Sequence, residues 1–142
     1  MTQSAAFLQV RLGARRVGLP LRDIVAVEAV GTVYPVPAID ASCRGVISTR
    51  GRLMPVLELG KLIDAESSEG GGGTGIIFQI EGRNICLEVD EAEAIVHGDL
   101  LPLPPGEPLP WASAVVRRPE GLIPLVDLTA LGERLIIPEA SV

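Results

Sequence analysis

The sequence contains few aromatic residues and carries no excess of positive charge. Only 3% of its 142 residues are aromatic, and the net charge is −6. Single-stranded nucleic acids stack on exposed aromatic side chains, so their scarcity argues against a nucleic-acid partner. The net negative charge would also repel a phosphate backbone. We therefore expect no nucleic-acid binding and a core filled by aliphatic side chains.

Residues that commonly carry chemistry are equally scarce. Cys43 and Cys86 lie too far apart in the sequence to form paired zinc ligands, and they make no Cys-x-x-Cys motif. We interpret both as small buried hydrophobic residues. The only histidine, His97, stands beside Gly98 in what the pattern indicates is a strand-end turn. No nucleophile, base and orienting partner can be assembled. We expect no catalytic residues, no metal ligands, no cofactor and no enzymatic activity.

The sequence also lacks long hydrophobic runs. No apolar stretch approaches the ~20 residues that a membrane-spanning helix needs. Residues 1–4 are polar and show neither the basic region nor the apolar run of a signal peptide. These features predict a cytoplasmic protein without direct membrane insertion.

The apolar residues that are present occur in runs of strand length. Apolar residues make up 47% of the chain and charged residues 21%, which is typical of a globular domain. Glycine and proline separate the runs, as in chains of short strands and tight turns. Pro55 indicates an edge strand or a bulge. Short helical turns are expected over Leu59–Ile63 and Thr129–Leu135. The predicted strands are Phe7–Leu12, Arg16–Leu21, Ile24–Val30, Gly45–Thr49, Leu53–Leu57, Ile76–Ile80, Asn84–Val89 and Leu122–Leu128.

One segment, Gly51–Ile63, occurs a second time in similar form. Aligning Pro55 with Pro124 pairs Met54 with Ile123, Val56 with Leu125 and Glu58 with Asp127. The match extends to the rest of the chain at a nearly constant spacing, which is the signature of an internal repeat. It places Leu8 on Phe78, Gly18 on Cys86, Val27 on Ile95, and Ser42–Thr49 on Trp111–Arg118. We predict that the chain is built from two similar halves.

Several residues suggest functions that their surroundings do not support. Glu58 and Asp127 could be paired carboxylates, but Leu follows each one, so polar residues on the outer side of buried strands are the better interpretation. Gly70–Gly73 is not followed by the Lys-Ser/Thr of a phosphate-binding loop and is interpreted as a flexible connector. Arg50 beside Gly51 at a hairpin tip could recognise a carboxylate or be a solvated turn residue. Around it, we expect Leu53, Val56, Leu57 and Leu59 to be buried.

The segment Gly45–Leu59, Gly-Val-Ile-Ser-Thr-Arg-Gly-Arg-Leu-Met-Pro-Val-Leu-Glu-Leu, resembles the Gly-Val-Ile-Asn-Leu-Arg-Gly…Pro-Val-Val-Asp-Leu hallmark of CheW-like chemotaxis adaptor domains. Val17–Leu21 ahead of Ile24–Glu28, and Gly121–Leu128, match other parts of the same pattern. The resemblance covers about residues 5–135. It implies an all-β fold of two SH3-like five-stranded β-barrels related by internal duplication, with short helical turns. Residues 1–142 would form a single CheW-like domain, with a first barrel mainly from 5–66, a Gly-rich loop at 67–75 and a second barrel mainly from 76–135.

The resemblance also implies a function in signal transduction by protein–protein interaction. CheW-like domains are non-enzymatic scaffolds that join the cytoplasmic tips of methyl-accepting chemoreceptors to the regulatory domain of a CheA-type histidine kinase, in a two-component system. Arg50 takes the place of the family's arginine in the hairpin turn, and Glu28 that of an acidic residue ending the preceding strand. In the family, the residues at these two positions are regarded as a charge pair near the receptor surface. Gly45 matches a glycine where a side chain would interfere. The implied receptor- or kinase-binding residues are therefore Glu28, Gly45, Arg50 and Gly51.

The sequence leaves both the kind of partner and the function itself open. Ser48-Thr49 stand where Asn-Leu is usual, which could indicate a divergent receptor, or an adaptor for surface sensing or another form of motility rather than flagellar chemotaxis. The alternative function is a two-barrel module that binds a small anion in the inter-barrel groove, with Arg50 as its anchor.

Overall fold

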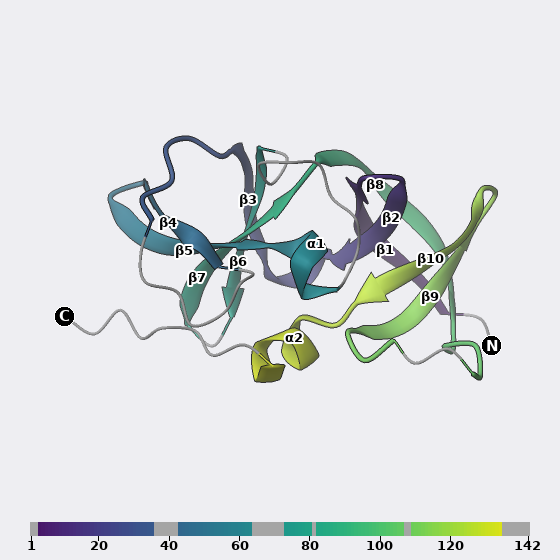
Figure 1. The fold of residues 1–142 in the computed structure, drawn as a ribbon. Helices are drawn as coiled ribbons and strands as arrows, with labels where there is room; N and C mark the ends of the chain where they lie inside the picture. Colours follow the sequence, from purple (N-terminus) through teal and green to yellow (C-terminus); the bar gives the residue numbers. More distant parts are fainter. Residues whose placement is uncertain (1–2, 36–42, 64–72, 81, 107–108, 135–142) are drawn as a thin grey trace.

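The computed structural model describes residues 3–35, 43–63, 73–80, 82–106 and 109–134 (Figure 1). These residues form strands with short helical segments between them. The strands are β1 (Gln3–Leu12), β2 (Arg15–Pro20), β3 (Ile24–Ala29), β4 (Cys43–Thr49), β5 (Arg52–Glu58), β6 (Thr74–Ile80), β7 (Arg83–Val89), β8 (Glu91–Leu101), β9 (Ala112–Arg118) and β10 (Gly121–Val126). The helical segments are a 3-10 turn (Leu21–Asp23), α1 (Leu59–Leu62) and α2 (Leu128–Arg134). The all-β prediction with short helical turns is confirmed.

The strands form two five-stranded sheets. The first closes into a barrel in the order β1-β2-β10-β9-β8, and the second has the order β3-β6-β7-β5-β4. In the second sheet, a single backbone bridge between Tyr34 and Val46 links the chain beyond β3 to β4. At the equivalent place in the barrel, β8 is longer than β3 and pairs directly with β9. The duplication therefore gives two related sheets, of which one is fully closed.

The predicted division, with a first barrel mainly from residues 5–66 and a second mainly from 76–135, omits an exchange of hairpins between the two sheets. Each sheet contains strands from both halves, because β1 and β2 join the strands of the second half and β6 and β7 join those of the first. The turns explain why the sequence suggested otherwise. Two-residue turns fix each hairpin locally, as in the closing pairs Leu12–Arg15, Thr49–Arg52 and Arg118–Gly121. The sheet that a hairpin joins is decided instead by long-range packing, which the spacing of strands does not encode.

The pairing between hairpins confirms the repeat at single-residue level. β2 lies parallel to β10 with Gly18 opposite Leu125, and β7 lies parallel to β5 with Cys86 opposite Val56. The repeat had aligned Gly18 with Cys86 and Leu125 with Val56, so the same contact occurs once in each sheet. The parallel pairing of β5 with β7 begins at Val56, directly after Pro55. Proline cannot donate to a ladder, so it stands where the strand still lacks that second neighbour.

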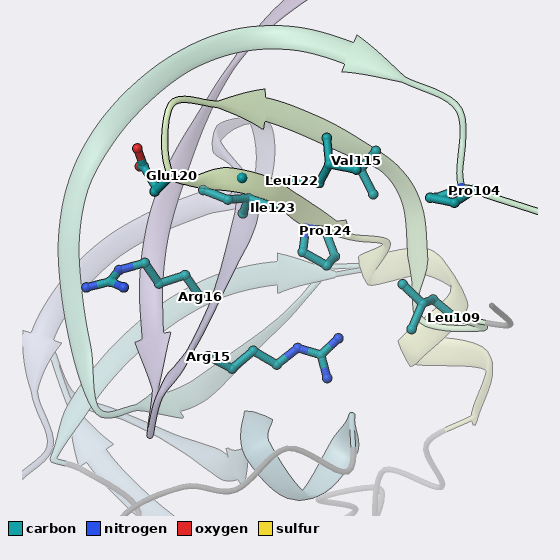
Figure 2. Close-up of a pocket in the computed structure, with 10 residues that line it drawn as sticks. Arg15, Arg16, Pro104, Leu109, Val115, Glu120, Leu122, Ile123 and Pro124 are labelled. Atoms are coloured by element: carbon teal, nitrogen blue, oxygen red, sulfur yellow. The ribbon is translucent and has the colours of Figure 1, made fainter.

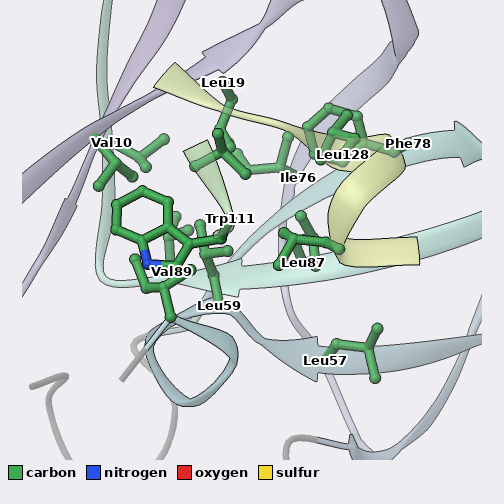
Figure 3. Packing of buried hydrophobic residues seen from close by; sticks show 14 of the residues in the cluster. Val10, Leu19, Leu57, Leu59, Ile76, Phe78, Leu87, Val89, Trp111 and Leu128 are labelled. Carbon is green, nitrogen blue, oxygen red and sulfur yellow. The ribbon is translucent and has the colours of Figure 1, made fainter. Parts of the chain in front are cut away.

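One hydrophobic core joins the two sheets. Its largest cluster combines residues from both halves, including Val10 and Leu19 of the barrel with Leu57 and Phe78 of the other sheet (Figure 3). Trp111 and α2, through Leu128, pack into the same cluster. The predicted burial of Val56, Leu57 and Leu59 is confirmed. Neither sheet could therefore be removed without exposing the apolar face of the other.

Each sheet also has one smaller cluster of its own, and the two clusters are formed by residues at equivalent positions of the repeat. Phe7, Val116 and Ile123 lie in the barrel, and Ile77, Ile47 and Met54 are their counterparts in the other sheet. At two neighbouring positions, a large residue in one sheet is matched by a smaller one in the other, and the adjacent residue changes size in the opposite direction. In the barrel the large Phe7 meets Gly18, where a Cβ atom would lie 2.5 Å from Cδ2 of the ring. In the other sheet the smaller Ile77 leaves room for the side chain of Cys86, which is buried.

Some expectations about single residues are wrong or untested. Leu53 is 70% exposed, because its neighbour Met54 faces inward and strand residues alternate between faces. His97 lies inside β8 and not in a turn. Gly98 beside it allows close approach to β9, since a Cβ atom there would clash with Val116. The predicted connector at 67–75 falls largely on residues 67–72, outside the described residues. None of the described helices is long and apolar enough to cross a membrane.

The compensation between Phe7 and Gly18 generates a stability prediction. Gly18→Ala should lower the free energy of unfolding by about 1–3 kcal/mol, because the added methyl group overpacks the barrel. In a Phe7→Leu background the same substitution should cost less by about 1 kcal/mol or more. Chemical denaturation of the four proteins of this double-mutant cycle measures both effects. Strictly additive losses would contradict the packing argument.

Candidate functional site

The hairpin tip between β4 and β5 has an unusual backbone. Thr49 and Arg52 form its closing pair, and the two turn residues both have positive φ, 54° for Arg50 and 75° for Gly51. Positive φ at both central positions is the pattern of a type I′ turn, which glycine and asparagine favour. Among the described residues, Arg50 is the only non-glycine with positive φ. Such conformations cost L-residues roughly 1–2 kcal/mol. An arginine held there points to a role for its side chain.

The Arg50 side chain is bound to Glu28 at the end of β3. Its Nη2 lies 2.6 Å from Oε1 of Glu28, and its Nε donates to the same oxygen at 2.9 Å. The hydroxyl of Thr49 donates to Oε2 of Glu28 at 3.1 Å. The arginine side chain remains 61% exposed and the glutamate 32%. The structure therefore joins Glu28, Arg50 and Gly51 into one accessible charged cluster, and Thr49 becomes part of it.

Gly45 lies at the other end of β4 and serves the backbone. Its φ is +148°, and a Cβ atom there would lie 2.9 Å from Cγ1 of Val33 and clash with the carbonyl of Tyr34. The next residue, Val46, exchanges two backbone hydrogen bonds with Tyr34, of 2.8 and 2.9 Å. Gly45 thus allows the chain beyond β3 to pair with β4, and it is not part of the charged cluster at the tip.

Exposed apolar side chains lie close to this cluster in the sequence and were not predicted. Val25 and Val27 of β3 are about half exposed, and Leu53 follows the turn on β5. The sequence does contain a signal for them, because β3 is apolar at almost every position while only alternate residues can face the core. Ile24 packs against the core, which leaves Val25 and Val27 on the outer side.

Behind the cluster lies a small pocket of about 220 Å³ between the end of β3 and the β4–β5 hairpin. Glu28 and Thr49 border it, and Ile47, Ile77 and Cys86 line its apolar part. Burial, and secondarily the carboxylates of Glu88 and Glu28, raises the pKa of the Cys86 thiol to about 12. The thiol therefore stays protonated at neutral pH and is no nucleophile.

The two equivalent carboxylates have separate structural roles at the starts of the helices. Glu58 is buried and pairs with Lys61 at 2.7 Å. Asp127 accepts a hydrogen bond of 3.1 Å from the backbone N–H of Ala130 and so caps α2. Within the part of the chain that the structure describes, no three His, Cys, Asp or Glu side chains could hold a metal ion.

Comparison with known proteins agrees with this architecture. A family model described as CheW-like domain matches residues 6–135. The chain belongs to the CheW-like domain family. It is 27% identical over 104 residues to protein FrzA of Myxococcus xanthus, a match that covers 70% of this chain and 65% of FrzA. The chain thus spans less than two thirds of that relative.

A solved structure shares the fold. The scaffolding protein TtCheW from Thermoanaerobacter tengcongensis superposes with a TM-score of 0.80 at 21% identity, covering 91% of this chain and 92% of that one. The CheW-like fold thus accounts for the two sheets. One part of the alternative function loses support, because Glu28 already compensates the charge of Arg50 that would have anchored a small anion.

The strained turn leads to a stability prediction. Arg50→Asn should leave the free energy of unfolding unchanged or raise it by up to about 1 kcal/mol, because asparagine relieves the positive-φ cost while an exposed ion pair contributes only about 0.2–1 kcal/mol. The matched variant Glu28→Gln removes the pair but not the strain, so it should be slightly less stable than wild type. Chemical denaturation measures both. A loss above about 1 kcal/mol for Arg50→Asn would show that the ion pair outweighs the strain.

Proposed function

We propose that the chain is a non-enzymatic cytoplasmic adaptor that couples the cytoplasmic tips of methyl-accepting chemoreceptors to the regulatory domain of a CheA-type histidine kinase. The output is chemotaxis or a related surface-sensing or motility response. The observation that carries the proposal is the Glu28–Arg50 ion pair, which stays exposed on a strained turn of a CheW-like fold. We assign the receptor contact to this cluster together with Gly51.

The surroundings of the ion pair suit a protein partner. Charges beside exposed apolar residues give the mixed surface on which apolar contacts supply affinity and charges set specificity and encounter rate. Leu53 provides the apolar part on β5, whereas Val25 and Val27 alternate with Glu28 and lie on the opposite face of β3. Gly45 contributes indirectly, because it lets the chain beyond β3 close against β4.

An adaptor must contact two partners at once, and the repeat offers two related faces. Val27 and Leu53 are exposed in one half, and their counterparts Ile95 and Leu122 are exposed in the other. The core of each half is already filled by other residues at equivalent positions. Packing therefore does not explain why both halves also expose a leucine and a β-branched residue at matching positions. Two apolar faces on one rigid body support simultaneous binding of receptor and kinase.

Co-sedimentation with receptor cytoplasmic fragments and a CheA-type kinase tests the proposal. We expect a ternary complex at tens of micromolar protein, and Arg50→Glu should weaken the receptor association by about 1–3 kcal/mol without unfolding the chain. The charge-swapped double variant Glu28→Arg with Arg50→Glu should recover part of that loss. Arg117→Glu on β9 makes the same change in net charge on the other sheet and should leave receptor binding near wild type.

Two results would count against the proposal. Failure to form any ternary complex under these conditions would remove the adaptor function. Additive losses in the double variant, with a folded protein, would show that the pair is not what the receptor recognises.

A further inference from the structure

A second pocket lies on the closed barrel, away from the β4–β5 turn. It has a volume of about 380 Å³ and is formed by the start of β2, the β9–β10 hairpin, and Pro104 and Leu109 between β8 and β9. Figure 2 shows Arg15 and Arg16 extending in opposite directions along it, with Leu109 on the Arg15 side and Glu120 on the Arg16 side. The pocket thus combines two cations and one carboxylate with an aliphatic wall.

The charge of Arg16 is already matched. Its Nε lies 2.8 Å from Oε1 of Glu93, and its Nη2 lies 3.3 Å from Oε2. Hydrogen bonding within this pair lowers the pKa of Glu93 and raises that of Arg16. Both groups are therefore charged and bound to each other at neutral pH. Arg16 has little capacity left for a further anion.

Arg15 is held differently. Its guanidinium lies over the ring of Trp111, 5.0 Å from the centroid, and Trp111 is itself buried in the core. Within the described residues, no carboxylate forms an ion pair with Arg15. A guanidinium stacked on an aromatic face keeps its N–H donors in the plane of the group, where they can bind a carboxylate through two hydrogen bonds. Trp111 thus orients a cation whose charge no carboxylate of the described residues matches.

The rest of the pocket is apolar and continues onto the surface. Val115, Ile123 and Pro124 form its wall beside Leu109. Leu122 also lines it and is 52% exposed, so the apolar area extends beyond the pocket. An enclosed small-molecule site would end at the pocket mouth, whereas an extended apolar rim suits contact with another protein. Glu120 would repel a second carboxylate at the far end.

We propose that this pocket binds an acidic side chain flanked by aliphatic residues on a partner protein, with Arg15 as the carboxylate anchor and Leu122 and Pro124 as the apolar contacts. The site lies on the closed barrel, whereas the Glu28–Arg50 cluster lies on the other sheet. The pocket shares Leu122 with the second apolar face of the proposed adaptor and so deepens that assignment, but its test needs neither receptor nor kinase, and either can fail alone.

The test is an NMR titration of the isotope-labelled full chain with the blocked peptide Leu-Asp-Leu at up to about 5 mM, the weak affinity expected for so small a contact. Addition of the peptide should shift the indole N–H of Trp111 and the amides of β10. The matched peptide Leu-Asn-Leu should bind about fivefold more weakly or worse, because it lacks the charge-assisted hydrogen bonds. Arg15→Gln should cause a similar loss with the Asp peptide, and Arg15→Lys a smaller one. Arg22→Gln, an exposed arginine outside the pocket, should bind like wild type.

Three outcomes of the peptide titrations would overturn the proposal. These are the absence of shifts at the highest peptide concentration, equal binding of the Asp and Asn peptides, and wild-type binding by a folded Arg15→Gln variant. Hexanoate is the remaining probe, since it carries a carboxylate on an aliphatic chain without a peptide. If it bound more tightly than Leu-Asp-Leu, the pocket would be a small-acid site and the assignment to a protein partner would be wrong.

Discussion

The reciprocal exchange of hairpins is the constraint on which the rest of the structure depends. The opening hairpin of each half pairs with strands of the other half. The hairpin β1–β2 lies in the sheet with β8, β9 and β10, and the hairpin β6–β7 lies in the sheet with β3, β4 and β5. A single core then spans both sheets, with Trp111 and Phe78 in the same cluster. Because neither half can bury its apolar face alone, the two sheets are held in one fixed arrangement. Surfaces on different sheets therefore keep a defined geometry, which a connector between two partners requires.

The charged cluster is itself a product of this exchange. Glu28 stands on β3, whose ladder partner β6 comes from the second half of the chain and places Glu28 opposite Gly75. Arg50 stands on the β4–β5 hairpin of the first half. The ion pair thus bridges elements that are aligned by long-range pairing, and its energy helps to hold Arg50 in a backbone conformation that arginine disfavours. The barrel shows a different arrangement at Arg15, where an aromatic ring orients the cation.

The sequence predicted much of the fold and part of the site. Strand periodicity, turn glycines and the repeat located the hairpins, because these signals are local. The exchange between sheets was missed, since it depends on which apolar faces meet after long loops. The pairing of Glu28 with Arg50 was expected only from the family resemblance. The exposure of Leu53 could have been inferred from strand alternation relative to Met54. The cation over Trp111 could not, because Arg15 and Trp111 are distant in sequence and meet only in the folded chain.

The most direct test of the central claim maps where a chemoreceptor tip contacts the chain. Backbone amide NMR shifts should be recorded while a receptor cytoplasmic-tip fragment is added to the labelled protein. The account predicts the largest changes at Glu28, Arg50 and Leu53, on β3 and the β4–β5 hairpin, with few on the closed barrel. Changes confined to the closed barrel, with Glu28 and Arg50 unperturbed, would contradict it.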